Sequence, residues 1–236
     1  MINIKMQKQP TDESCGATCL QAIYDFYGLH LEVHDVIQEV DRSLSGGTLA
    51  PLLGVAALKR DFKSKIYINN LTEFDPTWFK HGKTGNDALI KHLEEQLLYK
   101  HDKGLHQVSN AFIKFLKLGG DVCYHTLDVP LIKRYFDQNI PLIVGLNATY
   151  LYDCSREVFS QEGGASFDAI RGEPCGHFVV LCGYDETHRH VLVADPNQNN
   201  PLTTGCYYKV SSHRLINAIL LGVESYDAQI LVVEKK

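Results

Sequence analysis

Apolar residues recur at helical spacing through the first quarter of the chain. In residues 15–27 they lie three or four positions apart, and Gly28 follows as a typical helix C-terminus. Similar patterns predict short helices over residues 32–40 and 48–59. Residues 63–68 alternate between polar and apolar side chains, which predicts a strand. The first quarter is therefore expected to be mainly helical.

The middle of the chain predicts a pair of helices with apolar stripes, over residues 86–101 and 107–118. Residues 80–117 hold seven lysines against four acidic residues, so this region carries +3 and the remainder of the chain −8. The charge shift predicts a helical insertion or lid at about residues 80–120 of a single domain spanning residues 1–236. A solvated helix face explains these lysines better than a binding patch does.

The second half of the chain predicts mostly strands. One helix is expected over residues 130–138 and a glycine-containing active-site loop over residues 148–176. The predicted strands cover residues 122–125, 140–145, 178–184, 191–194, 207–210 and 228–233. This order indicates an α+β protein, with an N-terminal helical layer packed on a C-terminal antiparallel β-sheet.

Composition and charge exclude several classes of protein. The 236 residues are 44% hydrophobic and 22% charged, which argues against disorder. A net charge of −5 disfavours a nucleic-acid partner, because counterion release needs clustered Lys and Arg. No apolar run is long enough for a membrane span or for a signal peptide. We therefore expect a cytoplasmic protein with no membrane span, whose seven cysteines are reduced.

One cysteine has a distinctive setting. Cys15 opens the first predicted helix, after a polar turn and before Gly16, where free N–H groups and the helix dipole stabilise a thiolate. Asp12 and Glu13 act in the opposite direction, so activation also needs a histidine. The side-chain amide of Gln9 could join the Cys15 N–H to form an oxyanion hole. By itself, a cysteine at a helix start is more often a packing residue.

A hairpin is predicted where two apolar runs flank a polar turn at residues 185–188. With this turn centred on Glu186, His177 and Asp195 become direct cross-strand partners on one face of the sheet. Their Cβ atoms would lie about 5 Å apart, so the carboxylate could hold one imidazole nitrogen. The other nitrogen would then be free to accept the proton of Cys15. Taken singly, His177 and Asp195 are each better explained as structural residues.

These segments together resemble the papain-like cysteine peptidases. They are most similar to the bacteriocin-processing family, whose members cleave leader peptides after a double glycine. The matching positions are Gln9, Cys15, Gly16, Cys19 and Leu20, then Gly176 to Val180, and Asp195-Pro196. Gln9, Cys15, His177 and Asp195 have the residue types of the family in the same order along the chain. Together they support the resemblance more strongly than any one of them does alone.

The resemblance implies a papain-like fold and a role for each of four residues. Cys15 would be the nucleophile and His177 the general base. Asp195 would orient the histidine, and Gln9 would donate to the oxyanion. The chain departs from the family at Ser14, where aspartate is usual, and this position bears on leader recognition. The transporter's membrane span and ATPase are missing, which implies a stand-alone relative.

The expected function is therefore that of a cysteine peptidase or amidohydrolase-like enzyme that forms an acyl-thioester on Cys15 from a peptide or amide, a leader-type peptide included. Two alternatives stay open: an acyl- or peptidyl-transferase that uses the same acyl-enzyme, and a non-catalytic peptide-binding module. No cofactor is expected. Zinc is disfavoured because the cysteines and histidines of residues 175–206 include no CxxC pair and alternate between strand faces. A redox role for Cys175 or Cys19 is left open.

Overall fold

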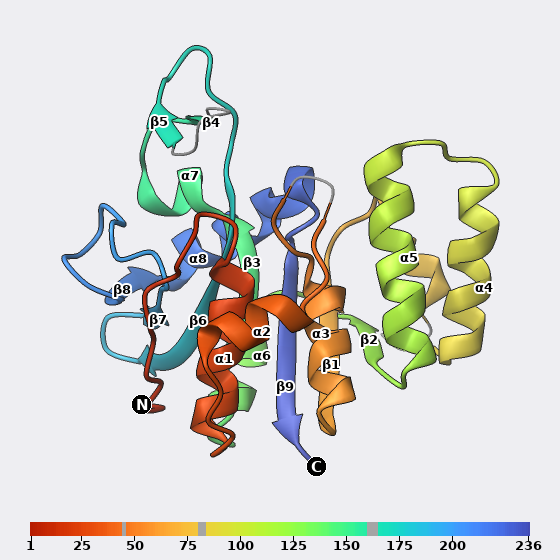
Figure 1. Cartoon of the computed structure of the whole chain (residues 1–236), viewed down its shortest axis with the longest axis horizontal. Coiled ribbons are helices and arrows are strands. Elements are labelled where there is room, and N and C mark those ends of the chain that lie inside the picture. The colour runs from red at the N-terminus through yellow and green to blue at the C-terminus, as the bar shows by residue number, and fades with distance from the viewer. Residues whose placement is uncertain (44–45, 80–83, 160–164) are drawn as a thin grey trace.

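The computed structural model describes residues 1–43, 46–79, 84–159 and 165–236. A seven-stranded sheet in the order β2-β1-β9-β3-β6-β7-β8 forms its centre (Figure 1). β1 and β2 run parallel, whereas the other neighbouring strands are antiparallel. The strands are β1 (Phe62–Ile68), β2 (Asp121–Tyr124), β3 (Leu142–Asn147), β6 (Gly176–Asp185), β7 (His190–Ala194), β8 (Tyr207–Ser211) and β9 (Gln229–Lys235).

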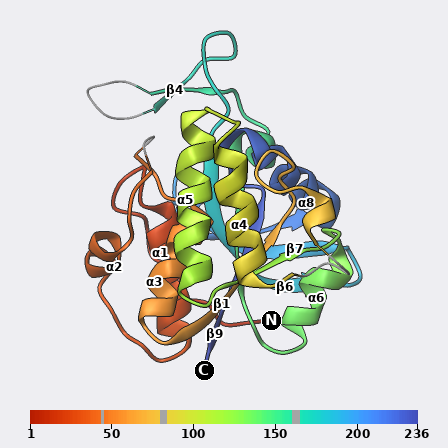
Figure 2. The same cartoon turned by 90° about the vertical axis from the view of Figure 1, so that its right-hand side faces the viewer.

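Helices cover both faces of this sheet, as Figure 2 shows. One face carries α1 (Cys15–Phe26), α2 (Val33–Glu39), α3 (Ala50–Lys59) and α5 (Lys103–Lys117), with α4 (Asn86–Leu97) packed on α5. The other face carries α6 (Val129–Phe136), α7 (Ala148–Tyr152) and α8 (Ser212–Leu220). Two short 3-10 helices, η1 (Pro76–Trp78) and η2 (Leu221–Ser225), join these elements.

The continuous apolar run in β6 follows from its position between the two helical layers. Phe178 and Val180 belong to the core on the α1 side of the sheet. Val179 and Leu181 belong to the core on the α8 side. A strand buried on both faces needs apolar residues at successive positions rather than at alternate ones.

The α+β class predicted from the sequence is confirmed, and α1 begins at Cys15 as expected. The structure adds features that the pattern did not reveal. β1 comes from the helical half of the chain and pairs with β9. α8 was not predicted, although Ser211 accepts a hydrogen bond from the backbone N–H of Arg214 as its N-cap. Residues 148–176 were predicted to be a loop, but they contain α7 and a small hairpin of β4 (Glu157–Phe159) and β5 (Ala165–Phe167).

The predicted register of the β6–β7 hairpin is wrong by two residues. Asp185 pairs with His190, so the connection covers residues 186–189, and a bulge at Cys182 then shifts the pairing by one residue. Val180 faces Ala194, which puts Asp195 across from Val179 rather than His177. Because the error is an even number, Asp195 and His177 still share one face and are diagonal neighbours.

The basic helical pair contributes to the main core through α5. Phe112 and Phe115 of this helix are fully buried on the α1 side of the sheet. Lys114 of the same helix donates a hydrogen bond to Asp41 Oδ2 at 2.6 Å, so part of the positive charge is paired within the chain. Residues 80–83 of the predicted insertion, and Gly163-Gly164 of the predicted loop, lie outside the described residues. The insertion at about residues 80–120 stays a prediction.

One end of the sheet gathers the segments that carry the motifs. Figure 1 shows that α1 starts, β3 ends, and β6 and β9 start at this same end, with the β4–β5 hairpin projecting beyond them. Within the described residues, the helices include none that is both long and apolar enough to cross a membrane. The candidate chemistry is therefore concentrated at this end of the sheet.

Replacing Phe112 with alanine should lower the free energy of unfolding by about 3–5 kcal/mol. Phe112 is fully buried and packs edge-on against Phe74, with ring centroids 4.8 Å apart. Phe167→Ala is the control, because Phe167 is 64% exposed. It should change stability by no more than about 0.5 kcal/mol in urea denaturation. Equal losses in the two variants would contradict this view of the core.

Candidate active site

Cys15 occupies the first position of α1, and its neighbour leaves the helix start open. The hydroxyl of Ser14 turns back to the preceding turn, where it accepts from Thr11 N at 3.0 Å and donates to Thr11 O at 2.8 Å. Ser14 therefore provides no side-chain cap for α1. The uncapped N–H groups and the positive end of the helix dipole favour an anion at Cys15.

Close packing of α1 on β6 brings the motif segments together. A Cβ atom built on Gly16 would lie 2.6 Å from Thr48 Cγ2 and 3.2 Å from Phe178 Cδ2. A side chain at position 16 would therefore clash with Thr48 and crowd Phe178 of β6. Phe178 follows His177, so Gly16 packs against the strand that carries the imidazole.

His177 lies between a carboxylate and the Cys15 thiol. Its Nε2 is 2.8 Å from Asp195 Oδ1, and Cys15 is near enough to act on the charge of its imidazole. Since Nε2 is engaged by Asp195, Nδ1 is the nitrogen available to the thiol. Burial lowers the pKa of His177, but the opposite charges of Asp195 and Cys15 raise it well above its usual value. The imidazolium form is therefore favoured.

Asp195 is fully buried and has a partner for each carboxylate oxygen. Besides His177, Oδ1 accepts from the backbone N–H of Asn197 at 2.9 Å. Oδ2 accepts from the hydroxyls of Tyr152 and Tyr208, each at 2.8 Å. Burial raises the pKa of Asp195, but the charge of His177 and these hydrogen bonds bring it below its usual value. Asp195 is thus held as a carboxylate.

The two tyrosines were missed in the sequence. Tyr152 belongs to α7, which lies in a segment that was expected to be a loop. Tyr208 lies on β8, next to the hairpin, and its position on the strand face of Asp195 could have suggested a contact.

Gln9 lies at the turn that leads into Cys15. Its Nε2 donates to Thr11 O at 3.1 Å and lies 3.4 Å from Asp12 O. The second distance is longer than an ordinary N–H···O bond, so one N–H of this amide is weakly engaged. Its Oε1 is buried and has no partner among the described residues. Gln9 N also donates to Pro196 O at 3.0 Å, which ties this turn to the residue after Asp195. A role in an oxyanion hole stays a prediction.

The remaining thiols near Cys15 are in settings that favour the protonated form. Burial raises the pKa of Cys175, and the charges of Glu157 and Cys15 raise it further. Burial likewise raises the pKa of Cys19 well above its usual value, and its Sγ donates to Phe178 O at 3.3 Å. Because the thiolate is the reactive form, these features favour packing roles over redox roles.

Two further carboxyl groups, those of Asp227 and Glu73, are buried near the start of β9. Burial raises the pKa of Asp227 to about 7, although the nearby Ser225 side chain and the charge of His177 lower it. Burial also raises the pKa of Glu73 well above its usual value, against hydrogen bonds from Asn70 and Gln229. Neither group was singled out from the sequence.

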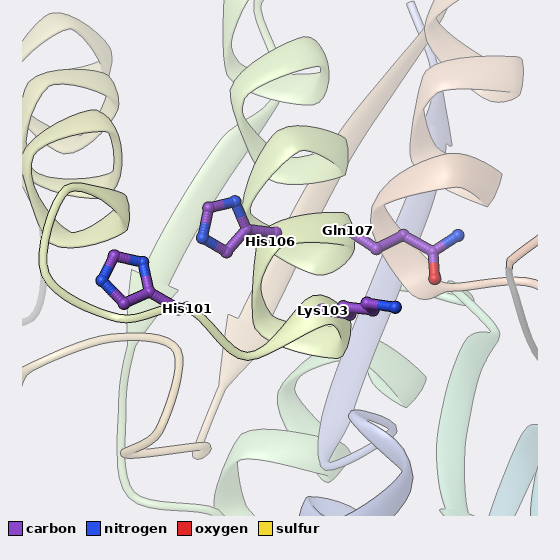
Figure 3. A pocket seen from close by; sticks show the side chains of 4 residues that line it. All are labelled: His101, Lys103, His106 and Gln107. Atoms are coloured by element: carbon purple, nitrogen blue, oxygen red, sulfur yellow. The ribbon is translucent and has the colours of Figure 1, made fainter.

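A pocket of about 460 Å³ lies away from Cys15 and His177, at the turn between α4 and α5. Figure 3 shows that His101 and His106 lie on one side of the start of α5, whereas Lys103 and Gln107 extend toward the other. The four side chains therefore do not converge on one point. Over the part of the chain that the structure describes, no three His, Cys, Asp or Glu side chains form a group that could hold a metal ion.

Comparison with known proteins assigns the family. The model of the Peptidase_C39 like family matches residues 1–214, and the chain therefore belongs to this family. It is a cysteine-type peptidase with the papain-like fold that the sequence predicted. None of the curated proteins matches it.

Several solved structures match nearly the whole chain at low identity. A C39-like peptidase from Bacillus anthracis is 14% identical, with a TM-score of 0.48 and coverage of 99% of this chain and 96% of that one. A double glycine motif protease from an AMS/PCAT transporter, in complex with the leader peptide, is 13% identical, with a TM-score of 0.46 and coverage of 100% and 94%. Xylellain, a cysteine protease from Xylella fastidiosa, is 12% identical, with a TM-score of 0.45 and coverage of 100% and 84%.

Tyr208→Phe should destabilise the protein by about 1.5–3 kcal/mol at pH 7, because it removes a hydrogen bond to a buried carboxylate. Tyr99→Phe should have no measurable effect, because Tyr99 is 82% exposed. Thermal unfolding of the two variants and the parent provides the comparison. A Tyr208 variant as stable as the parent would show that its hydroxyl does not support Asp195.

Asp227→Asn should change how stability depends on pH. Since the pKa of Asp227 is raised to about 7, the folded protein binds this proton more tightly than the unfolded chain. The free energy of unfolding should therefore fall as the pH rises from about 4 to about 7, and it should stay constant above that range. The total loss is about 1.4 kcal/mol for each unit by which the pKa differs between the folded and the unfolded chain. The asparagine variant should show a shallower decline in urea denaturation across this range. Asp137→Asn, at an exposed position, should keep the parent's slope; identical slopes in all three proteins would contradict the burial of a neutral carboxyl.

Proposed function

We propose that this protein cleaves a peptide or amide bond through an acyl-thioester on Cys15. The observation that carries the proposal is the position of His177, with Asp195 Oδ1 2.8 Å from Nε2 and with Cys15 near enough to act on the charge of the imidazole. In this proposal Cys15 is the nucleophile, His177 is the base, and Asp195 orients the base. Membership of a peptidase family supports the same reading.

Acylation begins from the state in which the Cys15 proton already lies on Nδ1 of His177. The sulfur attacks the carbonyl carbon of the scissile bond, and a tetrahedral intermediate forms with its negative charge on oxygen. The imidazolium then donates its proton to the leaving nitrogen as the C–N bond breaks, which leaves the acyl group on the sulfur. Throughout, Asp195 holds the Nε2–H and stabilises the imidazolium.

The oxyanion is stabilised by the backbone N–H of Cys15 and one N–H of Gln9. The helix start supplies the first donor because Ser14 does not cap it. The second donor is the amide hydrogen of Gln9 that has only the 3.4 Å contact with Asp12 O. Turning it toward the substrate gives up little hydrogen bonding.

Deacylation repeats these steps with water as the nucleophile. His177 removes a proton from the water molecule, which attacks the thioester carbonyl, and the C–S bond breaks as the thiol regains a proton. The products are a carboxylic acid, an amine and the free enzyme. We propose a peptide substrate of the leader type, following the motif resemblance, and a reducing cytoplasmic setting, because all seven cysteines are free thiols.

Iodoacetamide at neutral pH should label Cys15 about tenfold or more faster than any other thiol, because the proposed mechanism makes Cys15 the nucleophile. His177→Ala should abolish this difference. His188→Ala is the matched control, since the His188 side chain is 67% exposed. Mass spectrometry of the adducts gives the rate at each cysteine. Labelling of Cys15 no faster than of the other six thiols would rule out the proposed nucleophile.

Gln9→Ala should lower kcat by about 10²- to 10³-fold on any peptide that the parent hydrolyses in a library screen, through loss of one oxyanion donor. The rate at which iodoacetamide labels Cys15 should stay unchanged, because alkylation forms no oxyanion. Gln7→Ala, two residues earlier and exposed, should leave both rates at the parent's values. If Gln9→Ala keeps full kcat, Gln9 is not an oxyanion donor.

A further inference from the structure

The short helix α7 is anchored at its start to the strand that carries His177. α7 has only five residues, too few for its own hydrogen bonds to keep it helical in water, so contacts with other segments must hold it. The backbone N–H of Ala148 donates to Cys175 O at 2.8 Å, and the N–H of Cys175 donates to Thr149 Oγ1 at 3.1 Å. Because Cys175 is two residues before His177, these bonds tie the start of α7 to the chain that leads into the imidazole.

Arg214 of α8 secures the other end of α7. Its Nε donates to Leu151 O at 3.0 Å, and its Nη2 donates to Tyr150 O at 2.9 Å. These carbonyls belong to the last turn of the helix, where partners within the helix run short and the helix dipole favours a cation. The guanidinium also lies 5.4 Å from the centroid of the Tyr150 ring. Arg214 therefore holds the end of α7 at the residue before Tyr152.

Tyr152, the last residue of α7, meets both members of the His177–Asp195 pair. Its hydroxyl donates to Asp195 Oδ2 at 2.8 Å, and its ring centroid lies 6.2 Å from that of the imidazole. The hydroxyl of Tyr208 donates to the same oxygen at 2.8 Å, which leaves Oδ1 directed at His177 Nε2. All four side chains are buried, so a bond lost here is not readily replaced by one to water.

We propose that Tyr152 is a positioning residue that keeps the Asp195 carboxylate ionised and directed at His177, and that Arg214 keeps Tyr152 in this place through α7. The inference rests on the proposed function, since it takes His177 as the base of Cys15. In this scheme Tyr152 and Arg214 form no bond with the substrate and act on the base through Asp195.

The direction of the effect follows from the charge of Asp195. A hydroxyl that donates to a carboxylate favours its ionised form, so removing the Tyr152 hydroxyl should raise the pKa of Asp195. A protonated Asp195 no longer attracts the imidazolium, and the Cys15 proton then returns to the sulfur. Loss of the hydroxyl should therefore move the acid limit of Cys15 reactivity to higher pH.

Other titratable groups face the pair from several elements. The groups whose charges act on Asp195 or His177 are Cys15 and Cys19 of α1, Glu157 of β4, Tyr208 of β8, and Cys206 and Asp227 from the segments before β8 and β9. Burial raises the pKa of Cys19, Cys206 and Tyr208, so these three stay neutral at acid pH. Glu157 and Asp227 are the same in parent and variants, so a difference between the profiles reports on Asp195.

Alkylation of Cys15 by iodoacetamide from about pH 4 to about pH 8 tests the proposal without a substrate. Tyr152→Phe keeps the ring and loses only the hydroxyl. The acid midpoint of the rate should move up by about 1–2 pH units, the size expected for one hydrogen bond to a carboxylate, while the rate at about pH 8 stays at the parent's value. Tyr150→Phe is the matched control on the same helix, because Tyr150 is 39% exposed and should keep the parent's midpoint. A Tyr152→Phe variant that melts earlier but keeps the parent's midpoint has a packing role only, which overturns the proposal.

Arg214→Gln tests the second part of the proposal. It should raise the midpoint by about 0.5 pH unit or more in the parent and by nothing in the Tyr152→Phe background, where no hydroxyl is left to position. Arg134→Gln, at an exposed position of α6, should follow the parent. An equal shift with and without the Tyr152 hydroxyl overturns the role of Arg214. A parent whose Cys15 reacts no faster than the other thiols overturns the proposed function, whereas a selective Cys15 with an unmoved midpoint in Tyr152→Phe overturns this inference alone.

Discussion

The burial of Asp195 is the constraint on which the site depends. A fully buried carboxylate is tolerated only if its oxygens are satisfied, and Asp195 takes its partners from three separate parts of the chain. Tyr152 comes from the short helix after β3, Tyr208 from the edge strand β8, and His177 from the central strand β6. These segments must all be in place before the carboxylate can be buried without penalty. The geometry of the imidazole is thus a property of the whole sheet.

The helical layer on the α1 side has a different role: it holds the start of α1 against the start of β6. Position 16 of α1 has no side chain, which leaves room for Thr48 and for Phe178 of β6 beside it. The helices behind it, including α5 with its buried phenylalanines, fill the core that keeps α1 in this place. Cys15 therefore comes from the helical layer on one side of the sheet, whereas the tyrosines that hold Asp195 belong to the core on the other side. The candidate site needs both.

The sequence was sufficient for features that depend on local pattern. The start of α1 at Cys15, the α+β class and the shared face of His177 and Asp195 all follow from spacing and parity. The register of the hairpin does not, because the turn lies one position later than its polar residues suggest and Cys182 adds a bulge. Tyr152 and Asp227 were out of reach, since each depends on contacts between distant segments that no periodicity records.

The turn before Cys15 also bears on when chemistry becomes available during folding. Ser14 and Thr11 close that turn by contacts within four residues, so it can form as soon as this part of the chain emerges. The imidazole, by contrast, reaches its place only when strands from the last third of the chain have joined the sheet. The helix start can therefore form before the imidazole of His177 is in place. Folding of the first helices alone therefore produces the helix start of Cys15 without the imidazole that lies near it in the seven-stranded sheet.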